Sequence, residues 1–401
     1  MKNLKMILCS RWISPHNNGG VAMHNGNLVK MLNKKLHFDI VSLNNKENRF
    51  YYKKQNILYH SITFKQHRTS FFSKNLSIMN NGLRFFQDRT ISKNVSQLIK
   101  NIKSPLVEFI DINSDGYSFI KFNSHNPTKK KIVIRSHTPW GILEKYYKRL
   151  NIITSVSWKA KERELFCFKN CSYITTPSND LKKRLIDLYD IDHNNITVLP
   201  NIVDTNHFKP MNRKNNSNEF VIMHVGRFEI AKGVMNLINV FIDIAKENPN
   251  IKLLLVGEYR GDAKALCLTK IKNENLEDKV IFKGLVPYEE LPSIYANSDL
   301  VVVPSEIYES FSYTAAQGMA CGKAVIASKI GGIPETLNRG KSGLLFEPGS
   351  HRDLKKNIEL VIKDKNLKKD LEESARLYVD NSYSFEALKP KYLEYYRTIS
   401  K

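Results

Sequence analysis

The sequence of 401 residues is 42% hydrophobic and 25% charged, which is ordinary for a globular protein and leaves room for two domains with cores of their own. It has no run of about 18 apolar residues, so no transmembrane helix is expected, and residues 1–10 lack the small-residue cleavage site of a signal peptide. Five scattered cysteines without zinc-ligand spacing favour reduced, buried thiols in a cytoplasmic protein.

Positive charge is concentrated in the first half of the chain. Residues 1–200 carry 33 Lys and Arg against 13 Asp and Glu, whereas residues 201–401 carry 29 against 26. A lysine-rich composition common to the whole chain would make both halves basic. The asymmetry favours an acidic partner for the first half, and a membrane leaflet, an anionic glycan and a nucleic acid all fit.

The chain opens with a strand–loop–helix–strand pattern. Met6–Cys9 is the first predicted strand, a helix follows over about Val21–Lys35, and Phe38–Leu43 is the next strand. Just before the helix, Gly19 and Gly20 would let backbone N–H groups approach a phosphate or a sugar. Because glycine pairs are common outside binding sites, this pair alone is only a candidate ligand contact.

Residues 68–103 interleave aromatic and aliphatic side chains with Lys and Arg. Two interpretations of a helix with this pattern stay open. Its apolar face can pack on the sheet, or its basic and aromatic side chains can lie on an anionic membrane surface. Both can hold for different faces of one helix.

Two later strands end at polar residues. Leu106–Ile110 runs into Asp111, and Ile132–Arg135 is followed closely by His137. The carboxyl ends of parallel strands share one edge of an open sheet, where ligands bind. We take Glu108 and Asp111 as candidate acceptor contacts, whereas His137 is either a ligand contact or a hydrogen-bonded loop residue. The acidic residues here lack the spacing of a metal site, so no metal is predicted.

The α/β pattern restarts in the second half. Lys209–Asn218, rich in asparagine, is the predicted linker, Phe220–Val225 the next strand and Val234–Glu247 the next helix. Between that strand and helix, Arg227 and Lys232 stand on a loop flanked by glycines. Two cations at a helix N-terminus can neutralise a diphosphate and stabilise it as it departs. Two solvated surface charges are the alternative.

The segment 300–328 is the most informative part of the chain. It begins with the apolar strand Leu300–Val303, which ends at Pro304 and Ser305. A helix is predicted over Thr314–Ala320, with Ser310 as its N-cap and Gly322 as its C′ residue. The next predicted strand is Ala324–Ser328. Glu309 therefore lies at the carboxyl end of a buried strand and beside a helix N-terminus. Open α/β sheets bind anionic ligands at such places.

This segment resembles the signature of the retaining glycosyltransferase family 4 (glycosyl transferases group 1). The family pattern is Pro-Ser, then Glu-Gly-Phe-Gly, then a second Glu eight residues after the first in Glu-Ala-Met-Ala-Cys-Gly, then a Pro-Val strand. The corresponding residues are Pro304-Ser305, Glu309-Ser310-Phe311-Ser312, Gln317-Gly318-Met319-Ala320-Cys321-Gly322 and Ala324-Val325. The first Glu is present, but the second is Gln317. Similar motifs elsewhere are Gly19-Gly20, Ile196–Asp204, Gly226-Arg227 with Lys232-Gly233, Ile330–Glu335 and Gly343–Gly349.

The resemblance implies an α/β chain of the GT-B fold, with two Rossmann-like domains whose parallel sheets face each other across a cleft. We accordingly expect an acceptor-side domain at residues 1–205 and a sugar-nucleotide-binding domain at 206–382. A C-terminal helix at 383–401 should cross back and pack on the first domain. The resemblance also implies metal-independent, retaining transfer of a hexose-type sugar from a nucleotide-diphosphate sugar to a glycan or lipid-linked glycan acceptor, with no cofactor.

Residue roles follow from the same resemblance. The implied catalytic residues are His137 near the donor sugar, Glu309 on the sugar hydroxyls, and Arg227 and Lys232 on the diphosphate. Gln317 takes the place of the ribose-binding glutamate, and its neutral amide should weaken this contact without abolishing it. The remaining donor contacts implied are Gly19, Gly20, Val286, Ser310, Phe311 and Ser312.

Three other functions stay open. A sugar-nucleotide epimerase shares the two-domain architecture, a non-catalytic subunit would explain Gln317, and a nucleic-acid-binding protein would explain the positive charge. No nucleic-acid-binding motif is present, so no nucleic acid partner is expected. We predict a cytoplasmic enzyme of cell-surface polysaccharide biosynthesis (lipopolysaccharide or capsule), with a nucleotide-sugar donor and a glycan acceptor. Its basic first domain would contact the inner face of the cytoplasmic membrane.

Overall fold

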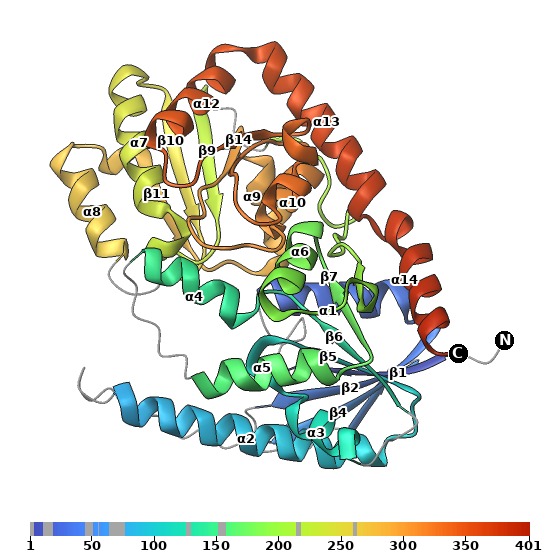
Figure 1. The fold of residues 1–401 in the computed structure, drawn as a ribbon. Coiled ribbons are helices and arrows are strands. Elements are labelled where there is room, and N and C mark those ends of the chain that lie inside the picture. The colour runs from blue at the N-terminus through green and yellow to red at the C-terminus, as the bar shows by residue number, and fades with distance from the viewer. Residues whose placement is uncertain are drawn as a thin grey trace. The chain divides into compact units, whose positions relative to one another are not determined.

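The computed structural model describes residues 4–10, 19–44, 51–54, 56–63, 77–125, 130–150, 158–213, 218–259 and 263–401. The chain forms two compact units, whose elements are labelled in Figure 1. Unit 1 comprises Met1–Ile202 and Leu388–Lys401, and unit 2 comprises Val203–Ala387. The last residues of the chain therefore belong to the same unit as the first.

Unit 1 is built on an eight-stranded sheet with the order β3-β4-β2-β1-β5-β6-β7-β8. Its strands are β1 (Leu4–Cys9), β2 (Leu36–Asn44), β3 (Tyr51–Lys54), β4 (Ile57–Thr63), β5 (Leu106–Ile110), β6 (Lys131–Arg135), β7 (Tyr173–Thr176) and β8 (Ile196–Val198). Neighbouring strands are parallel except for β3, which pairs antiparallel with β4 at one edge. Every residue of the central strand β5 is buried, as expected for a strand covered on both faces.

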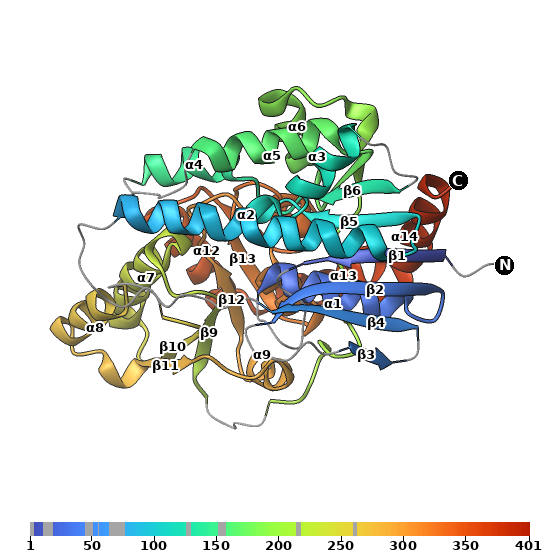
Figure 2. The same cartoon turned by 90° about the horizontal axis from the view of Figure 1, so that it is seen from below.

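The helices of unit 1 lie on both faces of this sheet. They are α1 (Gly20–Leu32), α2 (Ser77–Asn101), α3 (Tyr117–His125), α4 (Trp140–Arg149), α5 (Trp158–Asn170), α6 (Asn179–Tyr189) and, from Leu388 on, α14 (Phe385–Ile399). Helices α2, α3 and α5 lie side by side on one face, and α1 lies on the other (Figures 1 and 2). The carboxyl ends of β5 and β6, which Asp111 and His137 follow, thus belong to a sheet with helices on both faces.

Helix α2 bears on the two interpretations of residues 68–103. It begins at Ser77, and residues 68–76 lie outside the described part of the chain. Ile91, Val95 and Ile99, four residues apart on one face, are at most 4% exposed. Packing of the apolar face is therefore confirmed for this part of the helix, while the membrane contact stays a prediction.

Unit 2 is built on a parallel six-stranded sheet with the order β11-β10-β9-β12-β13-β14. Its strands are β9 (Phe220–Val225), β10 (Ile251–Val256), β11 (Val280–Gly284), β12 (Leu300–Val303), β13 (Ala324–Ser328) and β14 (Leu344–Phe346). Its helices are α7 (Val234–Glu247), α8 (Ala263–Asn273), α9 (Leu291–Ala296), α10 (Tyr313–Ala320), α11 (Ile333–Thr336), α12 (His351–Lys363) and α13 (Lys365–Tyr383). Helices α7, α8 and α12 pack together on one face, and α10 and α13 on the other (Figure 1).

Apolar runs flanked by Gly or Pro are where the sequence predicts boundaries best. The predicted strands β5, β9, β12 and β13 and the predicted helix α7 are confirmed residue for residue. Gly322 follows the C-cap of α10 with a left-handed φ of 68°, as its predicted role as C′ residue requires.

Two predictions about local structure differ from what the structure shows. Ser310 is not the N-cap of α10: Ser312 holds that position, with an extended backbone and with its Oγ accepting from the Ala315 N–H. The reason is that the irregular turn after β12 continues through Phe311 before helical angles begin. Strands β3 and β4 were not predicted, because β3 is short and half lysine and the apolar residues of β4 are interrupted by polar ones.

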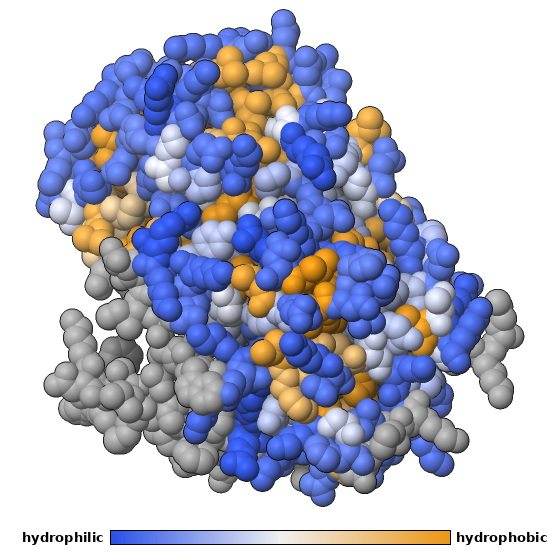
Figure 3. Space-filling model, in the orientation of Figure 1, coloured by the Kyte–Doolittle hydropathy of each residue, from blue (hydrophilic) through white to orange (hydrophobic). Residues whose placement is uncertain are grey.

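The surface is mainly hydrophilic on the face drawn in Figure 3, where apolar residues appear in small groups between polar ones. Within the part of the chain that the structure describes, no helix combines the length and apolar character needed to cross a bilayer.

Candidate functional site

The loop between β9 and α7 packs directly on the turn that follows β12. Gly233 has a left-handed φ of 72°, and a Cβ placed there would lie 1.8 Å from the carbonyl oxygen of Pro304. Only glycine permits this approach of one backbone to another. The consequence is that Lys232, the residue before Gly233, lies against the carboxyl end of β12.

Lys232 and Glu309 form an ion pair at this place. The Lys232 Nζ lies 2.9 Å from the Glu309 Oε1, and both side chains are 17% exposed. The hydroxyl of Ser305 donates to the same carboxylate oxygen. Burial by itself would raise the pKa of Glu309, but the Lys232 charge, the two hydrogen bonds and the Arg227 charge hold it below its usual value. Glu309 is therefore an anion fixed in one place.

The backbone of Glu309 is fixed as well. Its carbonyl oxygen accepts from the N–H of Gly332 at 2.7 Å. Gly331 beside it has a φ of 57°, and a Cβ there would lie 2.2 Å from the same oxygen. The loop after β13 thus closes on the turn after β12, and both ends of Glu309 are anchored.

Arg227 differs from Lys232 in its surroundings. Its side chain is 42% exposed and its Nη1 lies 3.2 Å from the Glu229 Oε1 on the same loop. Exposed ion pairs of this kind contribute little to stability and exchange partners readily. The loop therefore combines one cation held by a buried carboxylate with one cation open to solvent, where it can meet an anionic ligand.

His224 belongs to this site although no motif singles it out. It lies on β9, is 3% exposed, and its Nδ1 is 3.0 Å from the Val302 carbonyl oxygen on β12. Burial lowers its pKa to about 4, so the ring is neutral near pH 7. Its only sequence signal is a polar residue inside an otherwise apolar strand.

The segment from Ser310 to Gln317 leads from the turn into α10. Ser310, Phe311 and Ser312 are all buried, and Ser312 caps the helix. The hydroxyl of Thr314 donates to the Val225 carbonyl oxygen at 2.8 Å, which ties the first turn of α10 to the end of β9. The predicted donor contacts at 310–312 therefore lie beside the Lys232–Glu309 pair in unit 2.

Gln317 is enclosed within unit 2. It is 3% exposed, and its Oε1 accepts from the Tyr295 hydroxyl of α9 at 3.3 Å. The same hydroxyl lies 3.3 Å from the Thr314 carbonyl oxygen. Gln317 thus joins α9 to α10, and its predicted ribose contact stays a prediction.

Val286 lies on the loop after β11, next to an aromatic group. Leu285 before it is 65% exposed. The Tyr259 ring lies 3.8 Å from where a Cβ on Gly284 would be, and Lys264 places its Nζ 4.2 Å from the centre of that ring. The loop assigned to donor binding is therefore bordered by an aromatic side chain with a cation over it.

His137 lies at the end of β6 in unit 1 and is 4% exposed. Its ring packs edge-on to that of His24, with centroids 5.4 Å apart. Burial and then the charge of Arg135 hold the pKa of His137 well below its usual value, so it is a neutral hydrogen-bonding group near pH 7. Its backbone N–H donates to the Asp111 Oδ2 at 3.0 Å.

The two predicted acceptor contacts have partners inside unit 1. Asp111 accepts from the Ser136 hydroxyl at 2.8 Å and the Ile112 N–H at 2.9 Å, besides the His137 N–H. Glu108 is 1% exposed and accepts from the Tyr396 hydroxyl of α14 at 2.8 Å. Their contact with an acceptor stays a prediction.

Gly19 and Gly20 stand at the start of α1 and are exposed. Gly19 has a φ of 125°, and a Cβ built on it would meet nothing within 4 Å. The donor contact predicted for this pair stays a prediction. Among the described residues, no group of three or more His, Cys, Asp or Glu is placed to hold a metal ion.

Two family models match consecutive parts of the chain. Residues 18–207 match the model for Glycosyltransferase Family 4, and residues 207–378 match the model for Glycosyl transferases group 1. The chain belongs to the glycosyltransferases that these two models describe, family 4 and group 1. Arg227, Lys232, Glu309 and Gln317 all lie within the group 1 match.

Solved structures show the fold of this chain. Sucrose-phosphate synthase from Thermosynechococcus elongatus aligns over 99% of both chains with a TM-score of 0.80 at 19% identity. HepE from Anabaena, crystallised with UDP and glucose, aligns over 98% of both chains with a TM-score of 0.72 at 18% identity. The fold is GT-B, with two Rossmann-like units.

Two relatives that are more than 30% identical align over a shorter stretch. N-acetyl-alpha-D-glucosaminyl L-malate synthase of Bacillus anthracis is 32% identical over 174 residues, which are 43% of this chain and 44% of that protein. Lipopolysaccharide 1,2-N-acetylglucosaminetransferase of Salmonella typhimurium is 33% identical over 181 residues, 43% of this chain and 47% of that protein. The match thus spans about half the length of these curated relatives.

Proposed function

We propose that this glycosyltransferase moves a hexose-type sugar from a nucleotide-diphosphate sugar to a glycan or lipid-linked glycan, with retention at the anomeric carbon and without a metal. The observation that carries the proposal is the contact between the Arg227–Lys232 loop and the turn of Glu309. It gathers two cations and one fixed carboxylate at the carboxyl ends of two neighbouring strands, β9 and β12.

The cations suit the leaving group. As the bond between the anomeric carbon and the diphosphate oxygen breaks, negative charge builds on the diphosphate, and Arg227 and Lys232 would stabilise it there. The acceptor hydroxyl forms the new bond on the same face, and its proton passes to the departing phosphate oxygen. No enzyme nucleophile is needed, so the protein contributes position and charge.

Glu309 and His137 suit the sugar. A carboxylate with a depressed pKa accepts hydrogen bonds from sugar hydroxyls at every pH near neutrality. A neutral histidine can donate from one ring nitrogen and accept at the other. Each of these groups could contact a hydroxyl of the donor sugar.

The relatives support the substrate class. HepE was crystallised with UDP and glucose, and the Salmonella relative transfers N-acetylglucosamine in lipopolysaccharide. We therefore place the enzyme in cell-surface polysaccharide biosynthesis, at the inner face of the cytoplasmic membrane. Its basic first half, with 33 Lys and Arg against 13 Asp and Glu, would meet the acidic acceptor or the anionic leaflet.

A nucleotide-release screen tests the proposal. The protein is incubated with a panel of UDP-, GDP-, ADP- and dTDP-sugars, and free nucleoside diphosphate is measured with and without acceptor glycans. One donor should be hydrolysed slowly by the wild type and not by Arg227→Ala. Release of nucleotide from none of the donors, with any acceptor, would overturn the proposal. Conversion of a donor into its epimer without release would identify an epimerase instead.

A further inference from the structure

The loop from Ser136 to Gly141 connects β6 to α4 and carries His137. Pro139, the N-cap residue of α4, has no side chain that can accept a hydrogen bond and no N–H of its own. The first N–H groups of a helix need acceptors from elsewhere when the cap residue supplies none. Here Glu164 accepts from the first two N–H groups of the helix, and Asp111 accepts from N–H groups of the loop before it.

Asp111 serves the first part of the loop. It receives the His137 N–H at 3.0 Å and the Ser136 hydroxyl at 2.8 Å, and the Thr138 N–H also bonds to it. Asp111 follows β5, the strand paired with β6, so the strand order itself brings it to this loop.

Glu164 serves the second part. This residue of α5 receives the Trp140 N–H at 2.8 Å and the Gly141 N–H at 3.4 Å. Because Pro139 has no N–H, every backbone N–H from His137 to Gly141 ends on one of these two carboxyl groups. No motif singles out Glu164 in the sequence.

Tyr189 locks Glu164 in place. The Tyr189 hydroxyl, at the end of α6, lies 2.5 Å from the Glu164 Oε1. A Cβ on Gly141 would lie 2.3 Å from the same hydroxyl, so a larger residue here would displace the Tyr189 side chain. The Glu164 carboxyl group thus bonds to residues of two other helices, α4 and α6.

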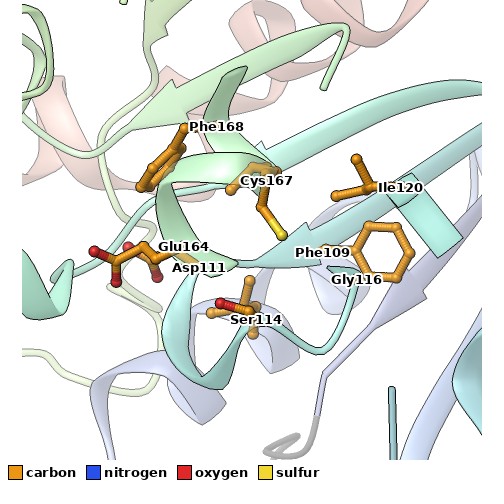
Figure 4. Close-up of a pocket in the computed structure, with 10 residues that line it drawn as sticks. Phe109, Asp111, Ser114, Gly116, Ile120, Glu164, Cys167 and Phe168 are labelled. Carbon is orange, nitrogen blue, oxygen red and sulfur yellow. The ribbon is translucent and has the colours of Figure 1, made fainter. Parts of the chain in front are cut away.

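The two carboxyl groups border the same small cavity. Figure 4 shows them near each other, and the Cys167 sulfur and the Phe109 and Ile120 side chains are among the other groups that line the cavity. The volume of the cavity that the centre of a water molecule can occupy is only about 10 Å³, which is room for about one water. Neither carboxyl group is therefore well hydrated.

We propose that Asp111 and Glu164 are positioning residues of the transferase, which hold the His137 loop in its working conformation and release it when they take up protons. The inference rests on the proposed function of His137. It differs from the earlier prediction for Asp111, because the carboxylate acts on the loop and not on the acceptor.

The pair is suited to respond near neutral pH. Burial raises the pKa of Glu164 to about 7; the hydrogen bond from Tyr189 lowers this pKa, and the charge of Asp111 raises it further. Burial likewise raises the pKa of Asp111 to about 6. A protonated carboxyl group loses acceptor capacity, so the loop should loosen as pH falls from about 7 to about 6. The other titratable groups around the pair are Tyr189, Cys167, Arg163, Asp115 and His137.

The pKa shifts of Tyr189, Cys167 and His137 place these three groups outside the same window. Burial raises the pKa of Cys167 and Tyr189 far above neutrality. Burial holds His137 neutral throughout. A change between pH 6 and 7 that disappears on substitution of Glu164 can therefore be assigned to the carboxyl pair.

The test compares Glu164→Gln with Glu162→Gln, an exposed residue of the same helix α5. Hydrogen exchange of the amides at 140 and 141, measured by NMR, should be faster in Glu164→Gln and unchanged in Glu162→Gln. In the wild type it should quicken from pH 7 to pH 6 beyond the intrinsic pH dependence of exchange, and this change should be absent in Glu164→Gln. Unchanged exchange in Glu164→Gln would overturn the proposal, and this readout needs no substrate.

A double-mutant cycle gives the second readout. With the donor found by nucleotide release, Glu164→Gln should lower kcat about 10-fold with little change in donor KM, as expected when a reacting group is misplaced. In a His137→Ala background it should cause no further loss. Losses that multiply would show that Glu164 does not act through His137, and would overturn the proposal.

If Glu164→Gln does not fold, Tyr189→Phe, which removes only the hydroxyl that bonds to Glu164, should shift both readouts in the same direction. A wild type inactive with every donor refutes the proposed function and leaves the exchange result standing.

Discussion

The Nζ of Lys232 lies 2.9 Å from the Oε1 of Glu309, so the residue assigned to the diphosphate and the residue assigned to the sugar hold each other in place. These residues are 77 positions apart in the chain. Their contact depends on Gly233, which lets one loop pack on the other's backbone. The proposed donor site of unit 2 is therefore one charged cluster and not two separate motifs.

Arg227→Ala and Lys232→Ala should both abolish sugar transfer, but with different effects on stability. Arg227 is exposed beside Glu229, so its loss should change the free energy of unfolding by less than about 0.5 kcal/mol. Loss of Lys232 leaves Glu309 without its cation and should cost about 1–3 kcal/mol. Nucleotide release and urea unfolding measure the two effects. Turnover retained in both variants would remove the diphosphate assignment.

His224 should make unit 2 less stable in mild acid. Its pKa is lowered from 6.5 to about 4 on folding, so the unfolded chain binds the proton more readily between these values. Stability is then full above about pH 6.5 and falls as pH drops toward 4. The expected loss between pH 7 and pH 5 is roughly 2 kcal/mol in urea unfolding.

His224→Asn is the matched variant, because its amide can still donate to the Val302 carbonyl oxygen. It should lose most of this pH dependence. A variant that keeps the same slope between pH 7 and pH 5 would show that other groups cause the acid sensitivity.

Gln317→Ala should weaken donor binding without abolishing turnover. A neutral hydrogen bond to a ribose hydroxyl is worth about 0.5–1.5 kcal/mol, so donor KM should rise by at most about tenfold. Tyr295→Phe is the control, since it removes only the hydroxyl that bonds to Gln317 within the protein. If neither substitution changes donor KM while both lower the melting temperature, Gln317 is a link between α9 and α10 and not a ribose contact.

Tyr396→Phe should destabilise unit 1. It removes the hydroxyl that bonds to the buried carboxyl group of Glu108, at an expected cost of about 1–3 kcal/mol. Tyr395→Phe provides the comparison on the same helix, because the Tyr395 hydroxyl has no hydrogen-bond partner among the residues described. That change should be neutral within about 0.5 kcal/mol in urea unfolding. Equal losses in the two variants would contradict the role of Tyr396.

The fold was largely predictable because it is encoded locally. The strands β9, β12 and β13 are apolar runs ended by Gly, Pro or Ser, and such runs are buried on both faces of a parallel sheet. The edge strand β3 and its neighbour β4 were missed because their residues mix polar and apolar side chains and form no long apolar run. The cap of α10 was placed two residues early because Ser310 and Ser312 are chemically equivalent as caps.

The site was only partly predictable. Arg227, Lys232 and Glu309 stand in recognisable motifs, and Gly233 lies next to them. Glu164 and His224 have no motif, because their surroundings come from segments far along the chain: Glu164 meets Trp140 across 24 positions and His224 meets Val302 across 78. Only the folded structure shows such relationships.

The closure of the Gly331–Gly332 loop on the Glu309 carbonyl has a consequence for substrate choice. A carboxylate held at its backbone and at its side chain has little conformational freedom left to lose when a sugar arrives. It also cannot shift to follow a hydroxyl of the wrong configuration. Epimeric sugars should therefore be rejected by rigidity, and substitutions that loosen residues 331–332 should broaden the range of donors while the fold stays intact.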